Sequence, residues 1–246
     1  MNINSLYSRN WLFISKKQQK KLKTTKILIC GTGLGSVIAE VLLRTGIQNI
    51  TIADGDCVEL SNLNRQNFIT KDIKINKAVA LQKRLNEICP SAKITVVSKF
   101  LNKNDLVQLI PTSDIVVNTI DFDSSAFIEC NNLCHKYKKH ELFPTNLGFG
   151  GSVIFSPPKS QKIGDFFHEK NKNLLKMKII SHVLSKCSPK MKTWLKKYKS
   201  SNIAYDPQLG ISSFVTAALL ATIVVRIITK DKTLKQFPEF YHTELF

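Results

Sequence analysis

The segment that most constrains the fold is KILICGTGLGSVIAE, residues 26–40. An apolar, β-branched run ends in three glycines, each separated by one residue, and an amphipathic helical pattern follows. Glycine lets the backbone turn sharply and approach a ligand closely, while a helix that begins there offers free N–H groups and the positive end of its dipole. The segment therefore predicts a strand, a phosphate-binding turn at Gly31, Gly33 and Gly35, and a helix.

The glycine spacing departs from the dinucleotide-binding pattern GxGxxG, which would place a glycine where the chain has Ser36. Two explanations remain open. Either the turn is one residue shorter, or serine replaces the glycine that packs the helix against the strand. The turn predicts a bound nucleotide without saying whether it is a dinucleotide or a nucleoside triphosphate.

Strand-like and helix-like segments alternate along the first half of the chain. We predict strands over 26–30, 49–54, 93–98, 114–121 and 150–157, and helices over 36–44, 78–88, 103–109, 124–137 and 211–228. This alternation is typical of βαβ units. The predicted fold is therefore α/β: a Rossmann-like, mostly parallel sheet flanked by helices.

We expect residues 1–246 to form a single domain with three segments. Residues 1–157 form the nucleotide-binding half, residues 158–206 a lysine-rich helical excursion, and residues 207–246 a C-terminal helix and tail. The second half is expected to continue the same sheet. In the excursion, apolar residues recur at helical spacing among lysines, which favours two amphipathic helices resting on the core. A lid or a partner-binding surface is the alternative.

The chain is strongly basic, with 36 Lys and Arg against 18 Asp and Glu and a formal net charge of +18. Such an excess suits a nucleic acid or an acidic partner. Lysine far outnumbers arginine, however, and arginine is the residue that binds phosphate through two parallel hydrogen bonds. We therefore favour a general compositional bias, and binding of tRNA stays an open alternative.

One stretch, residues 210–230, is long and apolar enough to be compared with a membrane helix. Thr216, Thr222 and Arg226 interrupt it, which suits a helix that is buried or faces a dimer partner. The N-terminal residues lack the basic-then-apolar pattern of a signal peptide. We expect a cytoplasmic protein that does not associate with membranes.

The cysteines do not form a CxxC pair, so a four-cysteine zinc site is not expected. The six positions are Cys30, Cys57, Cys89, Cys130, Cys134 and Cys187. Reduced, buried thiols are the favoured interpretation. Cys187 has a lysine neighbour, which can lower the pKa of a thiol, so a reactive thiol is the alternative at this position.

Two acidic residues follow the second predicted strand. Asp54 comes about 20 residues after the glycines, where an acidic residue commonly binds ribose hydroxyls. Asp56 is a second candidate in the same turn, or a turn former. Because NAD and ATP both contain a ribose, these residues do not discriminate between the two cofactors.

The segment DCVELSNLNRQNF, residues 56–68, favours a triphosphate. It gathers Asn62, Asn64, Arg65 and Gln66 just after the predicted ribose-binding acid. An arginine binds phosphate oxygens through its guanidinium, and amide side chains donate hydrogen bonds around them. A dehydrogenase has no evident use for this cluster.

Two further charged residues complete the set. Lys77 stands at the start of a predicted helix, from which it can reach a phosphate. Asp121 ends the fourth predicted strand, where a carboxylate can hold Mg²⁺ at the carboxyl edge of the sheet.

Taken in chain order, the glycine turn, Asp54, SNLNRQ, Lys77 and Asp121 resemble the ThiF/MoeB/HesA family, the bacterial relatives of ubiquitin-activating enzymes. Four other features fall in the family's order: YSRNW near the N-terminus, NEICPSAKITVV, PTNLGFGGSVIFSP and the final apolar helix. The resemblance covers about residues 6–228.

The resemblance implies that Asp54 binds the ribose of ATP and that Gly33 and Gly35 line the nucleotide. The residues implied to contact its phosphates are Asn62, Arg65 and Gln66. Lys77 would neutralise charge at the α-phosphate, and Asp121 would coordinate Mg²⁺.

The family's N-terminal arginine corresponds to Arg9, which would reach across a dimer interface to the neighbouring subunit's ATP.

The implied activity is that of an ATP-dependent adenylyltransferase. It would activate the C-terminal carboxylate of a ubiquitin-like sulfur carrier or of a peptide as an acyl-adenylate, releasing pyrophosphate. The resemblance also implies a homodimer. Alternatives are a tRNA threonylcarbamoyladenosine dehydratase of the same superfamily, an NAD(P)-dependent oxidoreductase and an inactive binding module. The family's paired CxxC zinc ligands are missing here, and Cys187 lies where relatives sometimes keep a reactive cysteine.

Overall fold

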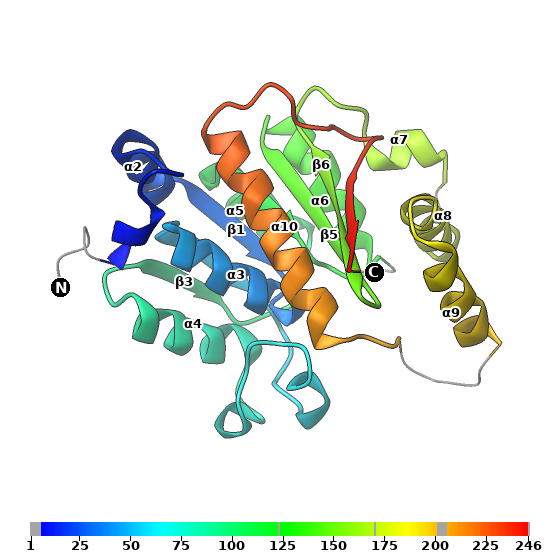
Figure 1. Ribbon diagram of the computed structural model, residues 1–246, viewed down its shortest axis with the longest axis horizontal. Helices are drawn as coiled ribbons and strands as arrows, with labels where there is room; N and C mark the ends of the chain where they lie inside the picture. The colour runs from blue at the N-terminus through cyan, green and yellow to red at the C-terminus, as the bar shows by residue number, and fades with distance from the viewer. Residues whose placement is uncertain (1–5, 123, 170, 201–205, 246) are drawn as a thin grey trace.

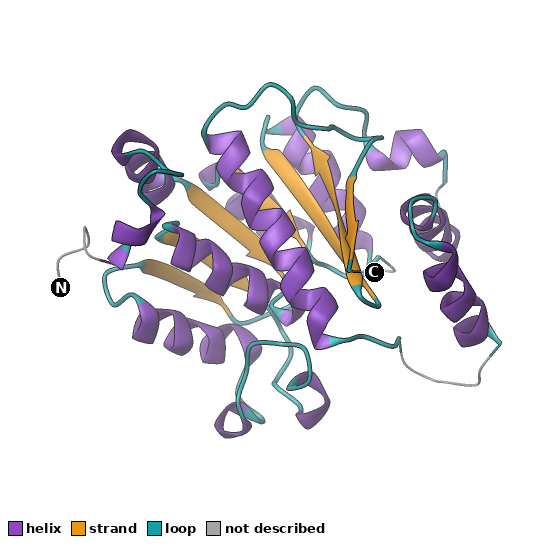
Figure 2. Cartoon of the chain, in the orientation of Figure 1, coloured by secondary structure: helices purple, strands orange, loops and turns teal. Residues whose placement is uncertain are grey.

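The computed structural model describes residues 6–122, 124–169, 171–200 and 206–245. Within these residues one seven-stranded sheet runs in the order β3–β2–β1–β4–β5–β6–β7, with helices on both faces (Figures 1 and 2). Neighbouring strands are parallel from β3 to β5, whereas β6 pairs antiparallel with β5 and with β7. The prediction of a Rossmann-like, mostly parallel α/β sheet is confirmed.

The strands agree with the sequence where the apolar pattern is local. Their bounds are β1 Lys26–Cys30, β2 Asn49–Ala53, β3 Lys93–Val97, β4 Ile115–Asn118, β5 His140–Leu147, β6 Gly150–Ser156 and β7 Tyr241–Glu244. β4 ends three residues before the predicted boundary, and β5 and β7 were not predicted. β5 contains a proline, which normally argues against a strand inside a sheet, and β7 is short and polar. Because β7 adds to β6, the C-terminal segment continues the sheet as expected.

The helices follow the predicted order, with several additions. They are α2 Lys16–Thr24, α3 Gly33–Thr45, α4 Lys77–Ile88, α5 Lys103–Leu109, α6 Ser125–Lys136, α7 Ile163–Phe167, α8 Lys172–Leu184, α9 Pro189–Lys199 and α10 Gly210–Ile228, with 3₁₀ turns η1 Ser8–Asn10, η2 Leu60–Asn62, η3 Thr70–Asp72 and η4 Ile110–Thr112. The lysine-rich α2 was not predicted because its pattern is mostly polar. Its start is nevertheless set by a capping box between Ser15 and Gln18.

The junction of β1 and α3 decides between the two explanations of the glycine spacing. Helix α3 begins at Gly33, and a Cβ atom on Gly35 would lie 2.8 Å from Cγ2 of Ile29. Gly35 is therefore the glycine that packs the helix on the strand, and the turn is one residue shorter. Ser36 is buried, donates to the carbonyl of Gly33 at 2.7 Å and accepts from the backbone N–H of Asn67 at 2.9 Å.

Helix α10 packs on α3, β5 and β6 along the front of the sheet (Figure 1). Its inner face, which includes Thr216, Leu220 and Val224, is fully buried, as the interpretation of a buried helix predicts. Its outer face carries the exposed Ile211 and Phe214. Among the described residues α10 is the one helix whose length and apolarity would also suit a membrane span; its packing is that of a core helix.

The excursion contains two helices, as predicted, α8 and α9, together with the short α7 (Figure 1). Residues 170 and 201–205 of this segment lie outside the described residues. The buried face of α8, formed by Leu175, Ile179 and Val183, joins a cluster that includes Phe143 of β5. The excursion is therefore attached to the sheet by an apolar contact.

Substituting alanine at Gly35 tests the short turn. Gly35→Ala is expected to lower the free energy of unfolding by about 1–3 kcal/mol, because the new methyl group would overlap Ile29. Urea unfolding followed by circular dichroism measures this change. Gly164→Ala in α7 is the matched control, since a Cβ atom there meets nothing within 4 Å. Equal stability changes in the two variants would contradict the tight helix–strand contact.

Candidate nucleotide site

A cavity of about 1250 Å³ opens at the carboxyl ends of β1, β2 and β4. Its floor includes Gly31 after β1, Asp54 after β2 and Thr119 after β4. β1 lies between β2 and β4, so the chain connections leave it toward opposite sides. Parallel α/β sheets bind ligands at such a switch point. The cavity is therefore in the position expected for a nucleotide.

The cavity brings together most of the residues that the sequence predicts for the site. Its walls include Gly31, Gly33, Asp54, Asp56, Asn62, Arg65, Gln66, Lys77 and Asp121. Gly35 is absent from these walls because it faces Ile29, so its expected place along the nucleotide is corrected to a packing role.

Arg9 lies far from this cavity in the same chain. It is exposed in η1, beside Asn10, whose side chain donates to the carbonyl of Thr45 at 3.0 Å. Thr45 ends α3, whereas the first residue of α3 lines the cavity. With a rise of about 1.5 Å per residue, the two ends are roughly 20 Å apart. The role of Arg9 in a neighbouring subunit's site stays a prediction.

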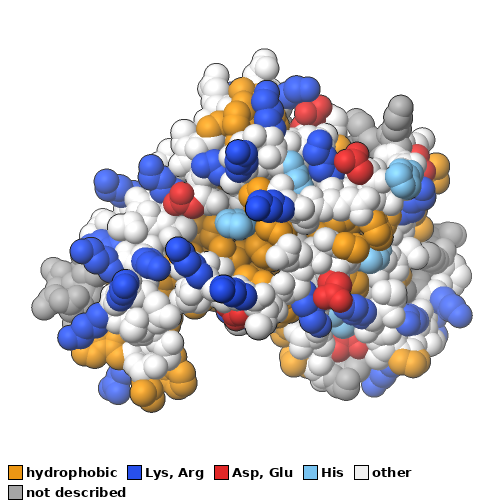
Figure 3. All heavy atoms as spheres, turned by 90° about the horizontal axis from the view of Figure 1, so that it is seen from above, with side chains coloured by type: hydrophobic (Ala, Val, Ile, Leu, Met, Phe, Trp, Pro, Cys, Tyr) orange, Lys and Arg blue, Asp and Glu red, His pale blue; other side chains and the backbone are white. Residues whose placement is uncertain are grey.

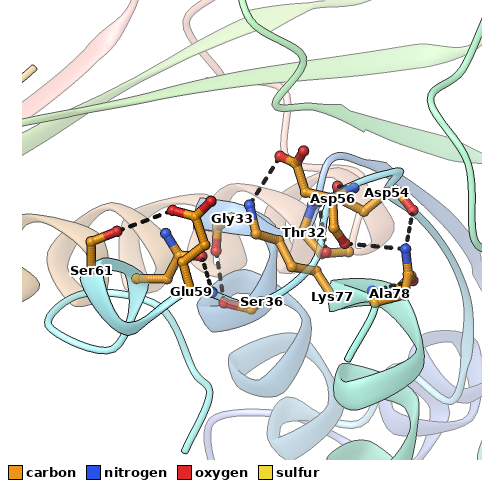
Figure 4. Close-up of polar contacts among 11 residues, drawn as sticks. Thr32, Gly33, Ser36, Asp54, Asp56, Glu59, Ser61, Lys77 and Ala78 are labelled. Carbon is orange, nitrogen blue, oxygen red and sulfur yellow. Dashed lines mark hydrogen bonds and ion pairs between the residues drawn. The ribbon is translucent and has the colours of Figure 1, made fainter. Parts of the chain in front are cut away.

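Asp54 fastens the glycine turn to the end of β2 (Figure 4). Its Oδ2 accepts from the backbone N–H of Thr32 at 2.6 Å and from the Thr32 hydroxyl at 2.8 Å, and its Oδ1 accepts from the N–H of Asp56 at 2.9 Å. A carboxylate has about four lone-pair sites. Asp54 therefore keeps acceptor capacity on a cavity wall after holding the turn.

Lys77 presents a buried ammonium group at the cavity. The residue is 8% exposed, and its Nζ lies 3.0 Å from Oδ2 of Asp56 (Figure 4). The Asp56 side chain is 54% exposed. A buried cation needs a counter-charge. Because the counter-charge of Lys77, Asp56, faces solvent, an anionic ligand in the cavity can replace Asp56 as its partner.

The position of Lys77 depends on the N-cap of α4. Asn76 accepts from the N–H groups of Ala78 and Val79 through its Oδ1, and its Nδ2 donates to the carbonyl of Asp56. The backbone N–H of Lys77 also donates to that carbonyl, at 2.8 Å. The cap thus fixes the helix start, and with it the lysine, against the turn that follows β2.

Arg65 is held by neutral oxygens. Its Nε donates to Oε1 of Gln208 at 2.6 Å, and its Nη1 donates to the carbonyl of Ser61 and to Oδ1 of Asn64, both at 2.8 Å. Burial lowers the pKa of the Arg65 guanidinium, but arginine stays charged at neutral pH. These bonds orient the guanidinium without neutralising it, which suits a phosphate ligand.

The side-chain amides of Asn62 and Gln66 have different roles. Asn62 is buried and shapes the loop: its Oδ1 accepts from the N–H of Glu59, and its carbonyl accepts from the N–H groups of Arg65 and Gln66. Gln66 has a buried Oε1 with no hydrogen-bond partner among the described residues. Its amide lies close to Gly33, where a Cβ atom would be 3.3 Å from Nε2. An unpaired acceptor beside the glycine turn fits a ligand that brings a donor.

Thr119 closes the floor of the cavity. Its hydroxyl lies 2.8 Å from the carbonyl oxygens of both Cys30 and Gly31. Gly31 has φ +96°, and a Cβ atom there would lie 2.7 Å from the Thr119 hydroxyl. Glycine is therefore required at this position both by the backbone conformation and by space.

Asp121 lies on the cavity wall three residues beyond the end of β4. Its side chain is exposed, and its carbonyl accepts from the N–H of Ser124 at the start of α6. Mg²⁺ is commonly held by one or two carboxylates together with phosphate oxygens. One carboxylate in the same cavity as Arg65 and Lys77 fits that donor set.

Sequence reasoning missed Thr32, Thr119 and Gln208. The two threonines sit in the predicted turns but resemble ordinary loop residues. Gln208 meets Arg65 across 143 positions of the chain, so no local pattern connects them. It also lies 3.5 Å from the amide of Asn146 at the end of β5.

The cysteines follow the interpretation of free thiols, with Cys57 exposed and the other five buried. Cys187 is 4% exposed, and burial, together with Glu244, raises its pKa to about 12. Cys187 is therefore a protonated thiol at neutral pH. The change in its pKa is opposite to the lowering that a lysine neighbour would cause. Cys187, His242 and Glu244 lie within 4.8 Å of one another, as do Cys130, Cys134 and Glu141. Neither group contains a CxxC pair, and the expected lack of zinc stays a prediction.

Comparison with known proteins identifies the family. The sequence profile of the ThiF family matches residues 7–246. The chain belongs to the ThiF family. The ThiF-family chain is 38% identical over 121 residues to the sulfur carrier protein ThiS adenylyltransferase of Bacillus subtilis (strain 168), covering 47% of this chain and 36% of that protein. It is 32% identical over 160 residues to the Escherichia coli (strain K12) protein of the same name, covering 63% of each. This chain therefore spans about a third of the length of the Bacillus subtilis protein and just under two thirds of the length of the Escherichia coli protein.

Solved structures share the fold of this ThiF-family chain. The crystal structure of Escherichia coli MccB with AMPCPP and MccA superposes with a TM-score of 0.71 and 22% sequence identity, covering 99% of this chain and 72% of that one. A likeness at this level of identity shows the fold alone. The 99% of this chain that superposes includes the excursion.

Thiol alkylation tests the environment of Cys187. At pH 8, iodoacetamide is expected to modify Cys57 in the native protein and to leave Cys187 unmodified, because a thiol with a pKa of about 12 carries almost no thiolate. Peptide mass spectrometry measures both sites. Comparable rates at the two cysteines would show that Cys187 is accessible and ionised.

Proposed function

We propose that the protein is an ATP-dependent adenylyltransferase that activates a substrate carboxylate as an acyl-adenylate. The observation that carries the proposal is the convergence of the Lys77 ammonium, the Arg65 guanidinium and the Gly31–Gly33 turn on one cavity, with Asp121 on its wall. Membership of the ThiF family and two relatives named as ThiS adenylyltransferases support it.

The reaction uses these residues for positioning and charge. A carboxylate oxygen of the substrate attacks the α-phosphorus of ATP, the bond from that phosphorus to the β-phosphate oxygen breaks, and pyrophosphate leaves. The carboxylate is already ionised at neutral pH, so the step needs no general base. Negative charge gathers on the phosphate oxygens in the transition state, where Arg65 and Lys77 stabilise it.

The remaining polar groups of the cavity suit the nucleotide. Asp54 would accept from the ribose hydroxyls, and the orphaned Oε1 of Gln66 would accept a donor of the ligand. Asp121 would hold Mg²⁺, which screens the charge of the phosphates when it is bound. The half-exposed Asp56 releases Lys77 when the phosphates enter.

The substrate class follows the relatives' names. Two relatives are named for the sulfur carrier protein ThiS, and the MccB crystal contains MccA. We infer a small protein or peptide that presents a C-terminal carboxylate. The proposal also includes a homodimer, in which Arg9 serves the neighbouring site and the exposed Phe214 side of α10 contributes to the interface, and a cytoplasmic location.

The alternative of a tRNA substrate draws on the segments RTGI, NRQ and IDF and on the positive charge of the chain. Lys and Arg side chains are scattered over the face in Figure 3 among few acidic ones. Binding to tRNA that falls steeply with added salt, with the loss of carboxylate activation, would favour that alternative.

Calorimetry with Mg²⁺-ATP and with NAD⁺ tests the nucleotide. The wild type is expected to bind ATP, and Arg65→Ala and Lys77→Met are each expected to weaken its binding by about 10-fold or more, because each removes a charge-assisted contact. Lys71→Ala, an exposed lysine outside the cavity, is the matched control and should bind as the wild type does. A preference for NAD⁺ would support the oxidoreductase instead, and ATP binding unchanged in both site variants would overturn the proposed site.

A further inference from the structure

The cavity continues well beyond the residues that suit ATP. Its volume of about 1250 Å³ exceeds the 300–1000 Å³ typical of sites for one small molecule. The added part lies between the β5–β6 turn and the excursion. Apolar side chains form much of its wall, namely Leu147, Phe149, Met177, Ile180, Leu184, Met191 and Trp194, and Lys176, Asn146 and Gln208 also line the cavity.

Helix α8 explains why this region is apolar. One of its faces, with Leu175, Ile179 and Val183, is buried in the core. A second face, with Met177 and Ile180, lines the cavity, and Met177 is 47% exposed. A helix that is apolar on both sides is normally covered on both sides. Within the described residues the second face meets the cavity, so a ligand is the candidate cover.

The apolar region leads outward along α8. A second cavity, of about 410 Å³, is lined by Leu174, Lys178 and their neighbours, and shares Met177, Ile180 and Leu184 with the first. The shared residues form an apolar border common to both cavities along α8. A long border of this kind suits an extended chain rather than a compact metabolite.

Helix α9 is held against the opposite wall. A Cβ atom on Gly148 would lie 2.3 Å from Cε of Met191, and the rings of Phe149 and Trp194 are 5.3 Å apart. Contacts this close join α9 to the β5–β6 turn. The region is therefore formed before any ligand arrives.

We propose that this apolar region receives a large apolar side chain at the C-terminus of a peptide substrate. The inference rests on the proposed function, because the carboxylate must lie beside the α-phosphate near Lys77 and Arg65. The peptide then leaves the cavity along Met177, Ile180 and Leu184. A Gly-Gly end brings no side chain into the apolar region and gains nothing from burial there. The site selects peptides ending in Leu, Met or Phe over those ending in Gly-Gly or Asn.

Peptide-dependent ATP–pyrophosphate exchange tests this selection. The probes are octapeptide libraries randomised except at the C-terminus, which is Leu, Phe, Asn or Gly-Gly. We expect kcat/KM to be at least about 10-fold higher for the Leu and Phe libraries, as burial of a large side chain implies. Met177→Ser should lower kcat/KM for these libraries by about 10-fold and leave the Kd for ATP unchanged. Val107→Ser on α5, a partly exposed residue outside both cavities, is the matched control and should leave both unchanged.

Binding is read separately from turnover by the fluorescence of Trp194. In a Trp11→Phe background, where Trp194 is the remaining tryptophan, the Leu library is expected to shift its emission and the Gly-Gly library to leave it unchanged.

The outcomes separate the two proposals. If ATP–pyrophosphate exchange is equal for all the C-termini, or faster with Gly-Gly or Asn, the preference for an apolar C-terminus is overturned. The proposed adenylation is then still supported. ATP binding without exchange for any library overturns the inference together with peptide activation. A protein that does not bind ATP overturns the proposed function as well.

Discussion

The site depends on the close contact between the end of β1 and the end of β4. Gly31, at φ +96°, lies against Thr119, whose hydroxyl donates to the carbonyls of Gly31 and of Cys30, the last residue of β1. Asp54 then ties the next residue, Thr32, to the end of β2. Three parallel strands are thereby joined at one point, and α3 starts there with Gly33 on the cavity wall. Gly35 completes the junction by letting α3 lie directly on β1.

The two cations of the site, Lys77 and Arg65, are placed so that a bound anion would pair with both of them. Lys77 is buried with a half-exposed partner, and Arg65 is bound by neutral oxygens. Removing cations from water is costly, and an opposite charge offsets that cost. A triphosphate would pair with both groups in a cavity where water screens them weakly. This pre-positioned charge is what an adenylation step requires, because little else in the reaction calls for a protein group.

Local patterns were enough to predict β1, the glycine turn, α3 and the order of the polar residues, since each depends on neighbours in the chain. What they could not supply comes from distant contacts. Pro144 pairs with Val153 inside the sheet, although proline normally argues against such a position. Gln208, just before α10, reaches Arg65 across the chain. The spacing of residues in α8 predicted an amphipathic helix but not that its second apolar side faces the nucleotide cavity.

A crystal structure of the protein with AMPCPP and Mg²⁺ tests the central claim most directly. The account predicts the ribose at Asp54, the phosphates between the Gly33 turn, Arg65 and Lys77, and the metal ion at Asp121. It further predicts that the Lys77 ammonium moves from Asp56 to the phosphates. Nucleotide bound outside this cavity, or Lys77 still paired with Asp56 while the phosphates contact other residues, would contradict it.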